Sequence, residues 1–337
     1  MNIEKILTEL SNSCAIGSVT DAVKLLEKQL SKYGTIEKSN GLTRSLTIKG
    51  KDDYTLLIDA HIDEVGFVVT DVSDSGFLTV SNLGGIDLRH LAAKPVTIHG
   101  KKKVCGVFVS TPPHLDKNDA VPENISKIKI DTGLGNSAKD IISVGDYVTY
   151  RQTADILNGD TVCGKSLDNR AGVATLILLA ERLHKKRLPI TVEFLFSDAE
   201  ELGLRGAKTA AFKSTADEAI IIDVSFGDGP DIPATKCGIL GAGGMIGMSP
   251  VLNRDITDKL ILLASDNAIP YQNEVMGGKT STNADAVSIC GGGIPSGLIS
   301  IPLRNMHTDV ETVKLDDIIS VADLLEKYIL SGGLKNA

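Results

Sequence analysis

The sequence contains no tryptophan, and aromatic residues make up only 4% of its 337 residues. The sequence therefore offers few aromatic residues for a cleft that binds sugars by stacking them on aromatic rings. Lysine and arginine number 35 against 43 aspartate and glutamate residues, which gives a net charge of −8. Because no long basic run offsets this charge, we expect no nucleic-acid-binding surface.

The five cysteines are scattered, odd in number and without CxxC spacing. This pattern favours reduced thiols over a disulfide framework. No apolar run approaches the length needed to span a membrane. The first residues, MNIEKILTEL, also lack the layout of a signal peptide. We therefore expect a cytoplasmic protein that has neither a membrane nor a nucleic acid as its partner.

Strand and helix signals alternate at both ends of the chain. Apolar residues recur at helical spacing in three segments, 18–34, 171–186 and 313–333. Short apolar runs typical of buried strands open the segment 54–70 and fill 190–196 and 218–224. Such alternation predicts an α/β fold with a mixed central sheet and helices on both faces.

Between residues 71 and 160 the pattern changes to short β-rich runs, separated by turn signals about every ten residues. This region is predicted to be a small β-barrel or sandwich inserted into the α/β domain. The α/β domain would then comprise residues 1–70 and 161–337. The glycine-rich run GAGGMIGMSP (241–250) lacks the Gly-Lys-Ser/Thr ending of a phosphate loop. We expect it to be a close-packed backbone loop near the active site.

Candidate ligands lie at or just beyond the predicted strand ends, where open α/β sheets place their ligand chemistry. They are His61 and Asp63 in LLIDAHIDEVGF, Asp168 in GKSLDNRAGV, Glu200 and Glu201 in FSDAEELGLRG, Asp223 in AIIIDVSFGD, and His307 in ISIPLRNMHTDVET. Adjacent carboxylates disfavour each other's ionised form, and a bound cation would compensate. A nitrogen and oxygen ligand set without thiolates suits zinc, cobalt or manganese better than it suits a cysteine-rich structural zinc site.

Each candidate alone also has a structural explanation. A carboxylate just before a helix, such as Asp168, commonly caps that helix. His61 alone fits a core histidine, and His307 alone fits an ordinary loop residue. Asp223, which follows three isoleucines, fits a ligand and a structural role about equally. The coincidence of these residues at successive strand ends is what favours a shared site.

Five motifs occur in one order along nearly the whole chain. They are DAHIDEVGF (59–67), TPPHL (111–115), KSLDNRAG (165–172), EELGLRGA (200–207) and GLISIPLRNMH (297–307). In these motifs the sequence resembles the TET-type dinuclear metallo-aminopeptidases. That family includes glutamyl and leucyl aminopeptidases, and some of its members carry the label endoglucanase M.

The resemblance implies two divalent metal ions per subunit, with zinc or cobalt expected before manganese. Asp168 would bridge the two ions. His61 and Asp223 would complete one metal site, and Glu201 and His307 would complete the other. The fold implied is that of the zinc exopeptidases.

The resemblance also implies the catalytic roles and the substrate. Glu200 would be the general base that takes a proton from a metal-activated water, and Asp63 would hold His61 in orientation. The substrates would be short peptides that lose their N-terminal residue. The insert at 71–160 would be a dimerisation domain, with dimers combining into a homo-oligomeric shell of twelve subunits.

Two other classes of function stay open. One is a glycoside hydrolase, as the endoglucanase label suggests, and the other is a non-catalytic subunit on the same fold. Glycosidase carboxylates flank a sugar at a separation of about 5–9.5 Å, so the adjacency of Glu200 and Glu201 counts against the first. Two departures from the family pattern, Ala284 in NADA and Asn305 in RNMH, are expected near the substrate and leave the preferred N-terminal residue undecided.

Overall fold

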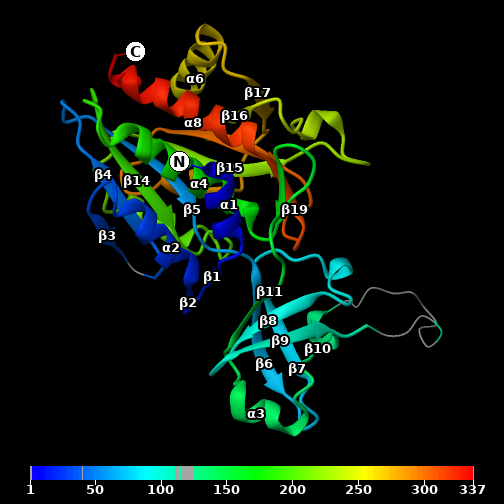
Figure 1. Cartoon of the computed structure of the whole chain (residues 1–337). Helices are drawn as coiled ribbons and strands as arrows, with labels where there is room; N and C mark the ends of the chain where they lie inside the picture. Colours follow the sequence, from blue (N-terminus) through cyan, green and yellow to red (C-terminus); the bar gives the residue numbers. More distant parts are fainter. Residues whose placement is uncertain (1, 40, 111–113, 115–123, 337) are drawn as a thin grey trace.

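The chain forms an α/β unit from which a β-barrel projects (Figure 1). The computed structural model describes residues 2–39, 41–110, 114 and 124–336. Apart from His114, which is exposed, the TPPHL motif at 111–115 lies outside the described residues. In the described part of the chain, no helix has the length and apolar character needed to cross a membrane.

The α/β unit is built on an eight-stranded sheet. Its strands, in sheet order, are β17 (Tyr271–Val275), β16 (Gly244–Met248), β18 (Ser296–Leu303), β15 (Glu218–Phe226), β5 (Thr55–His61), β14 (Thr191–Ser197), β4 (Arg44–Ile48) and β3 (Ile36–Lys38). The four central strands β18, β15, β5 and β14 are parallel. Strands β4 and β16 run antiparallel to them at either side. The expected mixed central sheet is confirmed.

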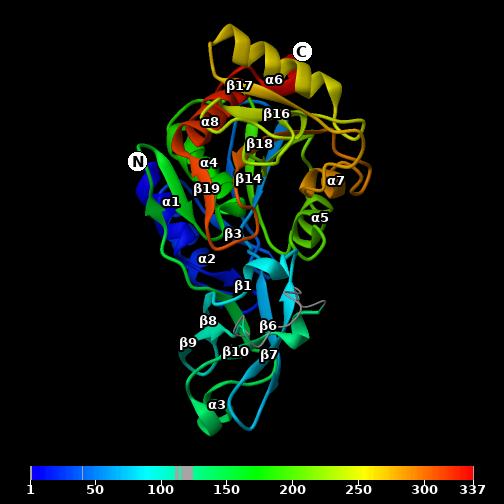
Figure 2. The same ribbon diagram turned by 90° about the vertical axis from the view of Figure 1, so that its right-hand side faces the viewer.

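Alternating side chains of the central strands enter two separate cores. In β5, for example, Leu56 and Ile58 join the larger core, whereas Leu57 joins the smaller one on the opposite face. The larger core is covered by α1 (Ile3–Ser11), α2 (Asp21–Leu30), α4 (Leu167–Leu183), α6 (Arg254–Asp266) and α8 (Leu315–Leu330). The smaller core is covered by α5 (Arg205–Ala211) and α7 (Asn283–Val287). Figure 2 shows α1 and α2 on one side of the sheet and α5 and α7 on the other.

The glycine-rich run at 241–250 is not the loop that we expected. Residues Gly244–Met248 form β16, between β17 and β18. A β-carbon on Gly244 would lie 2.4 Å from Val321, so the missing side chain lets helix α8 pack closely on this strand. No residue of 241–250 lines the cavity of the candidate site, so the expectation that the run lies near the active site stays a prediction.

The β-rich region forms a closed six-stranded barrel, which confirms the predicted inserted β-domain. In barrel order its strands are β10 (Lys129–Asp131), β7 (Leu78–Leu83), β6 (Gly66–Val72), β11 (Tyr147–Tyr150), β8 (Pro95–His99) and β9 (Lys103–Phe108). The barrel has its own core, in which Phe67 contacts Phe108 and Tyr150 edge-on. Its α-helix, α3 (Ala138–Ile141), is a single turn.

Two small sheets complete the fold. β1 (Ala15–Ile16) pairs with β2 (Val19–Thr20). The other sheet joins β12 (Asp155–Ile156), β13 (Thr161–Gly164) and β19 (Glu311–Lys314). β12 and β13 follow the last barrel strand, β13 runs into α4, and β19 runs into α8. This second sheet therefore links the chain segment that leaves the barrel with two helices of the larger core.

Candidate active site

The seven predicted site residues gather at the carboxyl ends of the parallel strands. His61 ends β5, Asp223 lies near the end of β15, and Glu200 and Glu201 follow β14. Asp168 lies in the first turn of α4, and His307 follows β18. All of these line one cavity of about 270 Å³, whereas Asp63 lies beside it. The cavity wall is completed by Val224, Ser225, Phe226, Thr280, Ser281, Thr282 and Met306.

Asp168 lies between the two histidines. Its Oδ1 is 3.0 Å from Nε2 of His61, and its Oδ2 is 3.3 Å from Nε2 of His307. The backbone of Asp168 is not helical, although it falls within α4. The helix is instead capped by Asn169, whose Oδ1 accepts a hydrogen bond from the backbone N–H of Gly172 at 3.0 Å. The capping role that Asp168 alone could have had therefore belongs to its neighbour.

Glu201 and Asp223 each approach one imidazole. Glu201 Oε1 lies 3.2 Å from His307 Nε2, and Asp223 Oδ1 lies 3.7 Å from His61 Nε2. Ligand atoms of His61, Asp168 and Glu201 all lie within 4.8 Å of one another, close enough to share a metal ion. The residues form two groups, each with one imidazole and one further carboxylate, that meet at Asp168.

Asp63 contacts more of the site than His61. Its Oδ1 lies 3.4 Å from His61 Nδ1. Its two oxygens also accept hydrogen bonds from the backbone N–H groups of Glu200 and Glu201, at 3.1 and 3.2 Å. This carboxylate therefore fixes the backbone of the Glu200–Glu201 segment relative to the end of β5.

Burial sets the electrostatics of the site. It raises the pKa of Glu200 to about 8, a shift that His61 opposes and that Glu201 and Asp168 increase. It also raises the pKa of Glu201 and that of Asp223. Buried carboxylates this close together are stable as ions only beside positive charge.

The pKa values of the two histidines are raised and the pKa of Asp168 is lowered, so these groups favour their charged forms. Burial opposes the protonated imidazole, but hydrogen bonds to Asp168 and Glu201 raise the pKa of His307 to about 11. Burial likewise opposes ionised Asp168, but His307 and His61 outweigh it and lower the pKa of that carboxyl. The cluster attracts positive charge and offers only nitrogen and oxygen donors, so its residues fit divalent zinc, cobalt or manganese.

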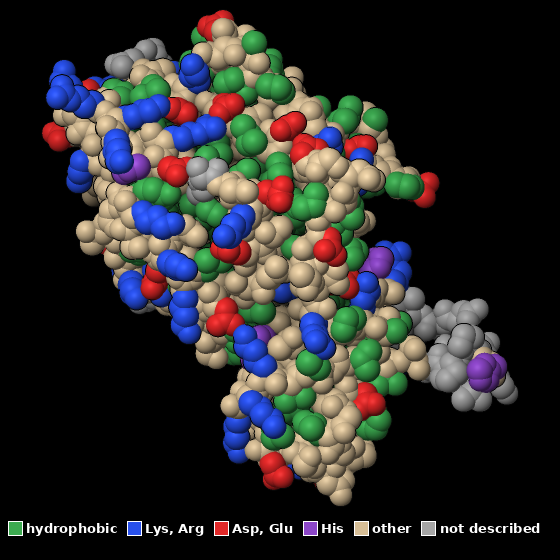
Figure 3. Space-filling view, in the orientation of Figure 1, with side chains coloured by type: hydrophobic (Ala, Val, Ile, Leu, Met, Phe, Trp, Pro, Cys, Tyr) green, Lys and Arg blue, Asp and Glu red, His purple; other side chains and the backbone are tan. Residues whose placement is uncertain are grey.

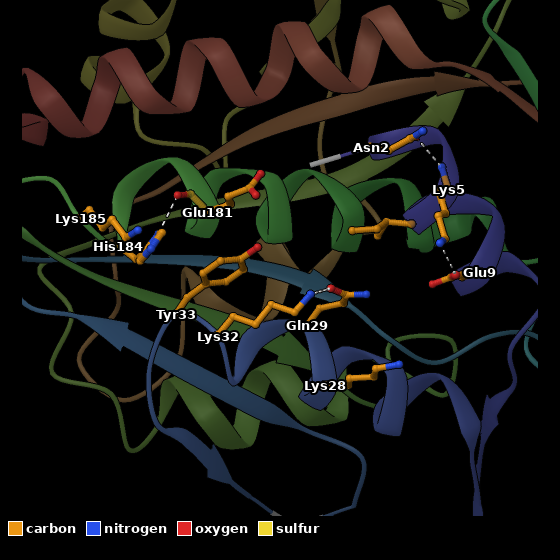
Figure 4. A pocket seen from close by; sticks show the side chains of 11 residues that line it. Asn2, Lys5, Glu9, Lys28, Gln29, Lys32, Tyr33, Glu181, His184 and Lys185 are labelled. Carbon is orange, nitrogen blue, oxygen red and sulfur yellow. Dashed lines mark hydrogen bonds and ion pairs between the residues drawn. The ribbon is translucent and has the colours of Figure 1, made fainter.

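A larger cavity, of about 550 Å³, lies between α1, α2 and the end of α4. Among the residues that line it, Figure 4 shows Lys32 hydrogen-bonded to Gln29 and Lys5 paired with Glu9. None of the seven predicted site residues lines it. Over the α/β unit in Figure 3, basic side chains are interspersed with acidic ones. The six predicted site residues that line a cavity therefore all belong to the smaller one.

Comparison with known proteins assigns the family. A family model described as M42 glutamyl aminopeptidase matches residues 44–324. The chain belongs to this family. Among curated relatives, a protein of Acetivibrio thermocellus whose assignment as an aminopeptidase is provisional is 34% identical over 297 residues, covering 87% of each chain. The glutamyl aminopeptidase of Lactococcus lactis is 29% identical over 345 residues, covering 97% of this chain and 95% of that protein.

The solved structures agree with this family. The TET1 peptidase of Pyrococcus horikoshii, described as able to assemble into a tetrahedron or a large octahedral shell, superposes with a TM-score of 0.86. The two sequences are 27% identical, and the match covers 98% of this chain and 99% of that one. The expected resemblance to TET-type peptidases is thus confirmed, and this M42 peptidase is a peptide hydrolase.

In this M42 peptidase, the loop that follows β7 of the barrel reaches the candidate active site. A β-carbon placed on Gly84 would lie 3.1 Å from Glu201 Oε2, and one on Gly85 would lie 3.2 Å from His307 Nδ1. Nearby, Lys94 Nζ lies 2.7 Å from Asp309 Oδ1, in the loop that carries His307. The barrel supplies none of the predicted ligands, but its backbone forms part of their surroundings.

The two departures from the family motifs do not lie in the cavity wall. Ala284 belongs to α7 and is fully buried in the smaller core, beside Asn283, which donates a hydrogen bond to Asp59 at 2.7 Å. Asn305 donates to the backbone of Val310 within its own loop. Each nevertheless lies within two residues of the cavity wall, Ala284 beside Thr282 and Asn305 beside Met306, so the expectation that they lie near the substrate stays a prediction. Ala284 is placed by helix packing, and Asn305 by a turn.

Three features beside the predicted metal ligands were not predicted from the sequence. Asn169 caps α4 and also donates to the Ile222 carbonyl at 2.7 Å, beside Asp223. Glu311, which is 1% exposed, accepts hydrogen bonds from the backbone of two site residues. A buried Glu64 pairs with Lys165, at 2.5 Å, beneath the loop that leads to α4. Lys165 and Asn169 fall inside the quoted motif KSLDNRAG, which was the available signal. Glu311 lies outside the five motifs, although the stretch ISIPLRNMHTDVET quoted for His307 contains it.

Proposed function

We propose that this M42 peptidase removes N-terminal residues from short peptides and uses two divalent metal ions per subunit to do so. Zinc or cobalt is the expected metal, before manganese. The observation that carries the proposal is the position of Asp168, whose two oxygens face imidazoles from different segments of the chain. Among protein side chains, a carboxylate is well suited to being shared by two cations in this way.

The proposal gives each residue of the cluster one task. Asp168 would be shared by both ions, His61 and Asp223 would complete one site, and Glu201 and His307 would complete the other. When bound, the metal ions would polarise the scissile carbonyl and lower the pKa of a water molecule.

Glu200 is the proposed general base. It lines the cavity beside the ligands and holds no imidazole contact of its own in the described structure, so its carboxylate is free to take the proton from the attacking water. The water oxygen bonds to the carbonyl carbon, the carbon–nitrogen bond breaks, and Glu200 gives the proton to the departing amine. Asp63 keeps this carboxylate in place through the backbone N–H of Glu200.

The test uses aminoacyl-p-nitroanilides on the purified protein. Hydrolysis should stop after treatment with a chelator and return when zinc, cobalt or manganese is added back. The same anilide with an acetylated amino group is the control, because an aminopeptidase should not release it. A cellulose substrate run beside the panel tests the glycosidase alternative. Hydrolysis that survives full metal removal would refute the proposal, and inactivity with every metal and substrate would favour a non-catalytic subunit.

We further propose that the inserted barrel, predicted at 71–160 and beginning in the structure with β6 at Gly66, makes the contacts between subunits, and that dimers combine into a dodecamer. The assembly described for the TET1 peptidase supports this proposal. Light scattering on the full chain, with and without chelator, measures the assembly size. Because Gly84 and Gly85 lie against Glu201 and His307, metal removal is expected to weaken the assembly. A monomer in the presence of metal would contradict the proposed assembly.

A further inference from the structure

Glu311 joins two distant parts of the proposed metal site. It is the first residue of β19 and is almost fully buried, at 1% exposure. Its Oε2 accepts a hydrogen bond from the backbone N–H of Asp168 at 3.0 Å. Its Oε1 accepts one from the backbone N–H of His307 at 2.7 Å. One carboxylate thus ties together the main chains of the shared ligand and of one of its histidine partners.

Strand pairing places Glu311 at this junction. In the sheet formed by β13 and β19, Glu311 is paired with Gly164, the last residue of β13 before the chain turns into α4. On its other side, Arg304 and Thr312 exchange backbone hydrogen bonds at 2.9 and 3.0 Å, which closes the loop that carries His307. The side chain of Glu311 therefore lies between two loops whose bases are fixed by β-pairing.

The backbone at both ligands needs such support. His307 has a φ of 62°, a left-handed conformation that costs a non-glycine residue roughly 1–2 kcal/mol. Asp168 has a φ of −78° and a ψ of 106°, outside the helical region at the start of α4. Regular secondary structure does not hold either residue, so their backbone N–H groups, that of Asp168 buried and that of His307 partly buried, need side-chain acceptors. A carboxylate accepts such hydrogen bonds more strongly than a neutral side chain does.

Asp63 supports the other half of the site in the same manner. It accepts the backbone N–H groups of Glu200 and Glu201, as Glu311 accepts those of Asp168 and His307. Neither Asp63 nor Glu311 lines the cavity, so neither is positioned to touch a substrate.

We propose that Glu311 is a positioning residue that sets the spacing of Asp168 and His307 before the metal ions bind. The inference rests on the metal ligands of the proposed function. A ligand pair that is already spaced correctly needs little rearrangement on binding, and partners of metal ligands typically contribute about 10–100-fold to metal affinity.

The test compares two variants with the same chemical change. Glu311→Gln keeps the size of the side chain but replaces one acceptor oxygen by a donor. Glu218→Gln is the matched control, because Glu218 is also fully buried and also accepts a backbone N–H, from Leu334 at 3.2 Å, together with the Tyr328 hydroxyl at 2.7 Å. Glu218 begins β15, at the end opposite to Asp223.

Co²⁺ is titrated into each metal-free protein and followed by calorimetry and by its visible absorption. Glu311→Gln should weaken at least one Co²⁺ equivalent by about 10–100-fold. Glu218→Gln should bind Co²⁺ as the parent does. Activity that Glu311→Gln loses at low Co²⁺ should return at high Co²⁺, because the residue acts through metal binding and not on the substrate.

Parent-like Co²⁺ affinity in a folded Glu311→Gln protein would overturn the inference, and so would an equal loss in Glu218→Gln. If Glu311→Gln does not fold, Glu311→Asp replaces it, since it keeps the charge but is too short by one methylene to reach both N–H groups. Unchanged affinity in that variant would also overturn the inference. A parent that binds no Co²⁺ would refute the proposed metal site itself. A parent that binds Co²⁺ without hydrolysing any anilide would refute only the aminopeptidase activity.

Discussion

Replacing Glu200 by glutamine separates proton transfer from metal binding at this site. Glutamine has the same shape, and the backbone N–H of residue 200 would still donate to Asp63. The amide cannot accept a proton from water, so turnover should fall by the usual contribution of a general base, about 10²–10⁴-fold. At about 1.4 kcal/mol for each factor of ten, this loss is about 3 to 5 kcal/mol of transition-state stabilisation.

The neighbouring residue provides the comparison. Glu201 Oε1 lies 3.2 Å from His307 Nε2, whereas Glu200 contacts neither imidazole in the described part of the chain. Glu201→Gln should therefore lose metal as well as activity, while Glu200→Gln should lose activity alone. Elemental analysis after dialysis gives the metal content, and initial rates on an aminoacyl-p-nitroanilide at saturating metal give kcat.

Two results would refute this assignment. Near-normal kcat in Glu200→Gln protein that contains its full metal complement would show that another group takes the proton. Loss of a metal equivalent from Glu200→Gln, with retention in Glu201→Gln, would exchange the two roles.

Three further predictions concern metal sharing, the barrel contact and stability. Asp168→Ala should lower the content of both metal equivalents, whereas His307→Ala should mainly lower one, as measured by elemental analysis. Gly85→Ala should weaken metal binding in a titration with Co²⁺, because its β-carbon would lie 3.2 Å from His307 Nδ1 and would displace the ring. Burial raises the pKa of Glu218, so its contribution to stability is complete below the ordinary glutamate pKa of about 4.3 and is lost as the pH rises through the folded value. Urea unfolding across that range should show a weaker pH dependence in Glu218→Gln, and an unchanged dependence would contradict the reasoning.

The sheet and its helices could be predicted because burial leaves a regular pattern in the sequence. Apolar runs such as 218–224 mark strands that are covered on both faces, and β15 (Glu218–Phe226) contains that run. The same reasoning failed at 241–250. There, the glycines permit close packing within β16, but a glycine-rich strand and a glycine-rich loop look alike in the sequence.

The candidate site was only partly accessible from the sequence, for a similar reason. Imidazoles and carboxylates at strand ends are visible as residue types, so His61 and Asp168 could be selected. Glu311 could not, because its importance comes from two backbone N–H groups that only the folded loops bring to it. Asp63 was expected to contact an imidazole, yet its hydrogen bonds to the backbone are equally direct. A carboxylate that accepts main-chain N–H groups from loops distant in sequence carries no sequence pattern of its own.

The position of the barrel within the chain affects synthesis on the ribosome. In the finished sheet β5 lies between β14 and β15, and both of these strands come later in the chain than all six barrel strands. The barrel encloses a core of its own, so its strands find their partners early. β5, which is buried from Leu56 to His61 in the finished fold, instead emerges with both edges unpaired and stays so until residues 191–197 and 218–226 have been made. An apolar strand with free edges is a template for pairing with other chains. The insertion thus lengthens the interval during which a nascent chain depends on chaperones or on rapid translation to avoid aggregation.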